Sequence, residues 1–83
     1  LRQQLAPLRK QATQLETQME KLGAKLQQIE TELADPSLYD AEMKAKLTAL
    51  LAEQVQVKKQ LEEVEVDWLA LQESIEDIMS QAE

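Results

Sequence analysis

The chain has 83 residues, of which 43% are hydrophobic, 2% aromatic and 30% charged, and it carries a net charge of −7 at neutral pH. So short a chain with so few aromatic residues cannot build a multilayered core, and its composition predicts one domain held together by a single seam of side-chain layers. It has no cysteine, no histidine, no glycine-rich phosphate loop and no apolar stretch long enough to span a bilayer, which argues against thiol, metal, nucleotide-binding and membrane-spanning functions.

Apolar side chains recur along the first half of the chain at intervals that alternate between four and three residues. A mean period of 3.5 residues is typical of the narrow seam of a left-handed coiled coil, and it predicts a helix over about residues 1–34. Pro7 is costly beyond the first turn of a helix, so regular helix is expected only from near Ala6, and Leu1 and Leu5 are expected to be the least secure layers. The seam positions are Leu1, Leu5, Leu8, Ala12, Leu15, Met19, Leu22, Leu26, Ile29 and Leu33.

A single break follows, and residues 35–40 are predicted to form a turn. Pro36 pushes the preceding Asp35 out of the helical region. Asp40 is a candidate N-cap of the next helix, with its carboxylate accepting from free amides of the first turn. So short a connection between two long helices favours antiparallel neighbours.

The same alternation resumes after the break and predicts a second helix over about residues 41–82. Among its seam positions, only Gln54 is not apolar. The complete set is Met43, Leu47, Leu50, Gln54, Val57, Leu61, Val64, Trp68, Leu71, Ile75, Ile78 and Ala82. The predicted fold is therefore all-α, a two-helix antiparallel coiled-coil hairpin.

A register that pairs Leu33 with Met43 aligns every remaining layer. It places Trp68 opposite Leu8, with its ring filling the space that the small Ala12 leaves. Flanking charges of opposite sign then face each other, and such pairs specify alignment more than they stabilise it. The five predicted pairs are Arg9 with Glu65, Glu16 with Lys58, Glu30 with Lys44, Lys25 with Glu53 and Glu32 with Lys46.

In this register, residues 76–83 extend past the first helix with nothing opposite them. Because the chain also begins at Leu1 rather than at a methionine, we interpret residues 1–83 as one coiled-coil domain that is a fragment of a longer protein.

Charge is unevenly distributed along the chain. Residues 1–59 hold all nine basic side chains and eight acidic ones, whereas residues 60–83 hold eight acidic side chains and no basic one. Nucleic-acid binding by phosphate neutralisation needs a basic stripe, and the second helix has none. The acidic run is interpreted as a solvated face, with docking on a basic surface as the alternative.

Two groups of residues are candidate partner contacts. Tyr39, Lys44 and Lys46 lie at the predicted tip, where Tyr39 is expected to cover the end of the seam rather than stack on a ligand. Val66 and Leu69 fall on outer heptad positions and form a candidate docking patch. No catalytic, cofactor-binding or metal-binding residue is predicted. The layer of Leu22 and Gln54, which lies beside Gly23 in the interior of the first helix, is a candidate weak point.

Four segments carry a resemblance that covers essentially the whole chain: Pro7-Leu8-Arg9-Lys10, Met19-Glu20-Lys21-Leu22, Leu38-Tyr39-Asp40, and Glu65 with Trp68-Leu69. Together they resemble the C-terminal coiled-coil domain of ABC-F ATPases. The resemblance implies ATP-binding cassettes in the same chain, ATP and Mg²⁺ bound by those cassettes rather than by this fragment, a cytoplasmic protein without membrane spans, and a role on the ribosome.

The expected function is that of a non-catalytic arm that positions a parent ATPase on the ribosome or another ribonucleoprotein. Ribosome or RNA is expected as the partner ahead of DNA, and the hairpin is expected to be monomeric. Two alternatives stay open. One is direct binding of DNA or RNA, as in one branch of the family and in the tRNA-gripping hairpin of seryl-tRNA synthetases; the other is a structural module for self-association.

Overall fold

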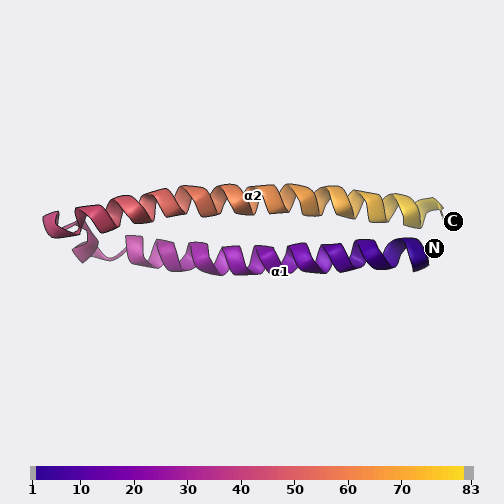
Figure 1. Ribbon diagram of the computed structural model, residues 1–83, viewed down its shortest axis with the longest axis horizontal. Helices are drawn as coiled ribbons and strands as arrows, with labels where there is room; N and C mark the ends of the chain where they lie inside the picture. The colour runs from indigo at the N-terminus through magenta and orange to yellow at the C-terminus, as the bar shows by residue number, and fades with distance from the viewer. Residues whose placement is uncertain (1, 82–83) are drawn as a thin grey trace.

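The computed structural model describes residues 2–81. Two long helices, α1 (Arg2–Leu33) and α2 (Lys44–Gln81), run antiparallel, so that the start of α1 and the end of α2 lie at the same end of the molecule (Figure 1). Two short 3₁₀ segments connect them, η1 (Pro36–Tyr39) and η2 (Ala41–Met43). The predicted all-α antiparallel hairpin is confirmed.

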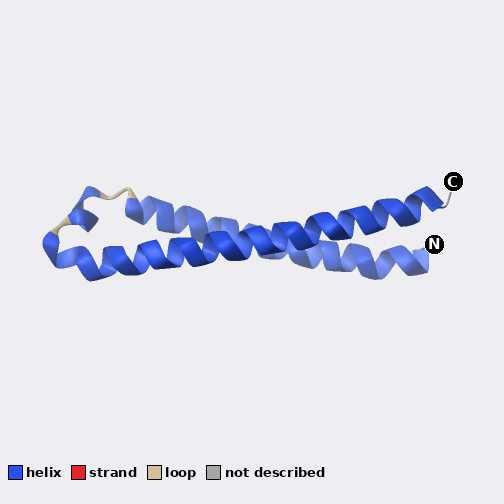
Figure 2. Cartoon of the chain, turned by 90° about the horizontal axis from the view of Figure 1, so that it is seen from above, coloured by secondary structure: helices blue, strands red, loops and turns tan. Residues whose placement is uncertain are grey.

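The molecule is a rod that measures 63 × 15 × 14 Å. Seen from above, the two helices wind across each other along their length (Figure 2), as expected for a seam with a 3.5-residue period. The part of the chain that the structure describes contains no helix long and apolar enough to cross a membrane.

The start of α1 differs from the prediction. The helix begins before Pro7 and includes it, so the expected start near Ala6 is wrong. Proline removes one helical hydrogen bond, to the carbonyl of Gln3 in the first turn. Leu5, expected to be a weak layer, is only 7% exposed and packs with Ile75 in a buried cluster. Burial of this layer outweighs the lost hydrogen bond; Leu1 lies outside the described residues.

The predicted seam is the core of the hairpin. Every described seam position is buried or half-buried, including the polar Gln54. The fully buried side chains form two clusters. A tip cluster consists of Ile29, Leu38, Leu50 and Val57, and an open-end cluster consists of Leu5, Ala12 and Ile75.

The two helices pair one heptad away from the predicted register. Leu8 packs against the open-end cluster around Ile75, seven residues beyond the predicted partner, Trp68. Trp68 lies instead beside Glu16, whose Oε2 accepts a hydrogen bond from the indole Nε1 at 3.1 Å. A slip of seven residues keeps every seam side chain on the seam, so the heptad pattern cannot distinguish the two registers.

The slip removes the expected overhang of the second helix. Ile78 packs against the open-end cluster. At the next residue, Met79 Sδ lies 3.9 Å from Arg9 Nη2, within donating distance. The expectation that residues 76–83 have nothing opposite them is therefore wrong for the part that the structure describes, and its last two residues lie outside that part.

The tip selects the register. Leu38, in η1, is 3% exposed and adds a side chain to the tip cluster, against which Leu33, Met43 and Leu47 also pack. The regular part of α2 accordingly begins at Lys44 rather than near residue 41. Because this connection is longer than the predicted turn, each residue of α1 faces a residue farther along α2.

Among the described residues, one ion pair lies within 4.0 Å: Lys25 Nζ is 3.4 Å from Glu53 Oε1. This predicted pair is confirmed. The pair was predicted from one register and is present in the other, which differs by one heptad. It therefore does not distinguish the two registers. The other four predicted pairs are wrong, since none of them lies within that distance: Arg9 with Glu65, Glu16 with Lys58, Glu30 with Lys44 and Glu32 with Lys46.

Replacing Gly23 by alanine is expected to stabilise the hairpin. The glycine has no positive φ, and an added Cβ would meet no heavy atom within 4 Å. Alanine loses less backbone entropy on folding, so the free energy of unfolding should rise by about 0.5–1 kcal/mol. Urea unfolding followed by circular dichroism measures the change. An unchanged or lower stability would contradict the open space around Gly23.

Candidate partner-contact surfaces

The tip is organised by its own hydrogen bonds. Asp35 Oδ1 accepts from the amide of Ser37 at 3.0 Å and from its hydroxyl at 2.9 Å, which caps η1. The amide hydrogen bond lowers the pKa of Asp35 below its ordinary value, and the Ser37 hydroxyl and the nearby Lys46 ammonium lower it further. The charged carboxylate is thus the form that holds the start of the connection.

The predicted capping role of the Asp40 carboxylate is wrong. Asp40 occupies the N-cap position of η2, but its side chain makes no capping hydrogen bond. The hydrogen bonds of Asp40 are made by its backbone. Its amide donates to the carbonyl of Ser37 at 3.3 Å, and its carbonyl accepts from the amide of Met43 at 2.9 Å. The side-chain cap at the tip is made by Asp35, at the start of η1, and it was not predicted.

The expectation that Tyr39 covers the end of the seam is wrong, because Leu38 occupies that place. Tyr39 is 59% exposed, and its hydroxyl donates to the carbonyl of Leu33 at 2.6 Å, which satisfies a free carbonyl at the end of α1. Leu38 covers the end of the seam. The aromatic ring therefore lies at the surface of the tip, tethered to α1 through its hydroxyl.

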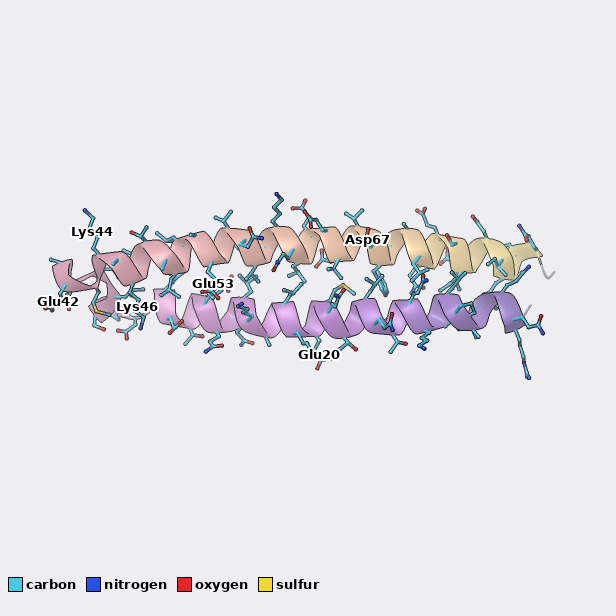
Figure 3. All side chains as sticks on the ribbon, viewed as in Figure 1. Glu20, Glu42, Lys44, Lys46, Glu53 and Asp67 are labelled. Carbon is cyan, nitrogen blue, oxygen red and sulfur yellow. The ribbon has the colours of Figure 1, made fainter. Side chains whose placement is uncertain are left out.

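The two candidate lysines lie on different sides of the tip. Lys44 extends away from α1, whereas Lys46 lies on the side that faces it (Figure 3), because residues two apart on a helix point in opposite directions. Lys46 is close enough to Asp35 to lower the pKa of that carboxyl. The structure therefore does not gather Tyr39, Lys44 and Lys46 on a single face.

A second surface lies on the outer side of α2. Val66 and Leu69 are 59% and 57% exposed and neighbour each other at i, i+3. A shallow groove runs on each side of them. One is lined by Lys59, Glu62, Glu63, Val66 and Asp67, and the other by Met19, Glu65, Trp68 and Leu69. The two side chains thus form a low apolar ridge between two grooves.

Trp68, half-buried on the seam, connects this surface to α1. Its indole Nε1 donates to Glu16. Ala12 lies in the open-end cluster, so the expected packing of the ring against Ala12 is wrong. The contact with Glu16 was not foreseen from the sequence, and only the correct register could have revealed it.

No group of three or more acidic side chains within residues 2–81 is arranged to hold a metal ion. The described carboxylates of α2 that follow residue 60 are all exposed. The described surface of the hairpin therefore offers exposed side chains for contact with a partner.

Comparison with known proteins yields one family and a group of relatives. Residues 7–73 match the family model described as ABC transporter C-terminal domain. The chain is 57% identical over 45 residues to "Probable ATP-binding protein YheS" of Haemophilus influenzae, a match that covers 54% of this chain and 7% of that protein. It is 47% identical over 52 residues to the protein of the same name in Escherichia coli, which covers 63% of this chain and 8% of the relative.

The matches thus span less than a tenth of the length of these relatives. No solved structure matches the chain. The family model covers the greater part of both helices and the whole tip, including all four segments that carried the resemblance. The resemblance to ABC-F ATPases is confirmed, and the chain belongs to the ABC transporter C-terminal domain family.

Proposed function

We propose that the hairpin is a non-catalytic arm by which an ABC-F ATPase positions itself against the ribosome or another ribonucleoprotein surface. The observation that carries the proposal is the shape of the molecule: a rod 63 Å long whose far end is ordered by its own contacts. Such a rod presents the tip at a distance from whatever its open end is attached to. The family membership supports an ATP-binding parent.

The construction of the tip supports this role. Leu38 anchors the connection in the tip cluster, and the Tyr39 hydroxyl ties it to α1. A connection already ordered in this way loses little conformational entropy when it meets a partner. Tyr39 and Lys44 are exposed at this end, and they supply a ring for stacking and an ammonium group for phosphate or carboxylate contact.

Charge disfavours DNA as the partner. The two helices differ, because α1 carries five basic and four acidic side chains, whereas α2 carries four basic and eight acidic ones. All four basic residues of α2 precede residue 60. Counterion release from DNA needs a continuous basic surface, so the hairpin alone should not bind duplex DNA appreciably at physiological salt.

The test reverses the charge of the tip in the full-length protein. We expect Lys44→Glu with Lys46→Glu to weaken ribosome association at least about tenfold, since a hydrogen bond to a charged group contributes about 1.5 kcal/mol or more. Co-sedimentation with ribosomes measures the change. These substitutions leave Leu38 in the tip cluster, so the packing of the tip is kept.

The matched control is Lys58→Glu with Lys59→Glu, which makes the same charge change on exposed residues in the middle of α2. We expect this variant to associate normally, and both variants to hydrolyse ATP at the original rate away from the ribosome. Equal association of the tip variant and the control, or tight binding of duplex DNA by the hairpin alone, would refute the proposal.

A further inference from the structure

The outer face of α2 combines exposed apolar side chains with a regular frame of acids. Val66 and Leu69 lie at the centre of this face; Glu62 precedes Val66 by four residues and Glu73 follows Leu69 by four. Residues four apart on a helix are direct neighbours. We call these four residues the outer patch. Glu62 therefore lies one turn before Val66, and Glu73 lies one turn after Leu69, so that the two glutamates flank the apolar pair.

The outer patch is not part of the fold's own packing. Neither Val66 nor Leu69 belongs to the buried clusters or to the side chains packed against them. All exposed large hydrophobic residues of the described chain, other than Tyr39 at the tip, belong to α2, and none belongs to α1. The exposure is thus a property of one side of the rod.

We propose that the outer patch binds an amphipathic helix of a partner protein that carries apolar side chains flanked by lysine or arginine. The low ridge between two grooves matches the way helices pack, with side chains of one lying between rows of the other. Glu62 and Glu73 would then meet basic side chains one turn on either side of the apolar contact. This proposal does not depend on the role of the tip.

Charge selects this occupant over the others. A second copy that laid the same face on the patch would oppose Glu62 and Glu73 with glutamates, which disfavours it. A nucleic acid would meet the same acids with its phosphates. Because residues 60–83 contain no basic side chain, the favourable electrostatic partner is a basic one. Two exposed apolar side chains are far fewer than a standard interface buries, so the contact is a weak one that adds to others.

The test uses two synthetic helical peptides of 21 residues as probes. Both carry leucines on one face; one has lysines a turn to either side, and the other has glutamates at the same positions. Titrated into the 83-residue chain labelled with ¹⁵N, the lysine peptide is expected to shift the amide signals of residues 62–73. The glutamate peptide is expected to leave them in place.

Two variants locate the site. Val66→Gln with Leu69→Gln is expected to weaken binding of the lysine peptide at least tenfold, and its surface position should leave the helix content unchanged by circular dichroism. Val55→Gln is the matched control, since Val55 is a 68% exposed valine on the same helix that is followed at i+3 and i+4 by Lys58 and Lys59. It is expected to bind the lysine peptide like the original chain.

Three results would overturn the proposal. The first is equal binding of both peptides, which would remove the role of charge. The second is an equal loss of binding in the Val55→Gln control. The third is a dimer of the original chain, seen by sedimentation, that Val66→Gln with Leu69→Gln converts to a monomer, because the patch would then be a contact between copies.

Discussion

Replacing Ile29 by alanine is expected to lower the free energy of unfolding of the hairpin by about 2–5 kcal/mol. Ile29 is 2% exposed and lies in the tip cluster with Val57, which is also 2% exposed. In a hairpin with a single seam, few neighbouring side chains can move into the cavity that the substitution leaves. The melting temperature should fall by at least about 8 °C in a chain of this size, as measured by circular dichroism.

The control for this substitution is Val55→Ala, on the exposed side of α2. Val55 is 68% exposed, so its truncation should change stability by no more than about 0.5 kcal/mol. A comparable loss in both variants would mean that the side chain of Ile29 is not specially buried, and the seam would have to be assigned differently.

A cysteine pair at Ala12 and Leu71 is expected to form a disulfide within one chain. Both positions belong to the open-end packing, where Leu71 contacts the cluster that contains Ala12. The bridge would close a loop of about 60 residues and, in the chain-entropy model, raise the free energy of unfolding by up to about 4 kcal/mol. Gel electrophoresis without reductant and thermal unfolding before and after reduction measure both effects.

The matched pair is Ala12→Cys with Val64→Cys, which would face each other in the register predicted from the heptads. One heptad is about 10.5 Å along a helix, whereas a disulfide needs Cβ atoms about 4 Å apart. This second pair should therefore stay reduced or cross-link only between molecules. Efficient closure of the second pair and failure of the first would establish the register that the tip cluster excludes.

Much of the candidate contact surface was visible in the sequence. The exposure of Val66 and Leu69 follows from their outer heptad positions, and the absence of basic residues after position 59 needs no structure. The tip was harder to predict. Its buried residue is Leu38 and its cap is Asp35, because a connection of ten residues between two helices has no periodicity from which burial can be read. The local sequence predicted a side-chain cap at Asp40, whereas the structure has it at Asp35.

The register of the two helices could not be predicted from the heptad pattern. Moving one helix by seven residues returns an equivalent arrangement of seam positions, and the confirmed pair of Lys25 with Glu53 is compatible with both arrangements. Charge pairs at the surface contribute too little to choose between them. The choice was made by Leu38, whose burial lengthens the connection and moves α2 along α1.

The sequence by itself determined that the chain forms two helices, that they return on each other, and which side chains face inward, because a 3.5-residue repeat and a proline-containing break admit few other structures. Only the tertiary structure decided which layer meets which, where Trp68 finds its hydrogen-bond partner, and how the tip is closed. Those features depend on contacts between residues far apart in the chain. A pattern that repeats every seven residues cannot predict these contacts, because it is unchanged when one helix moves by a heptad.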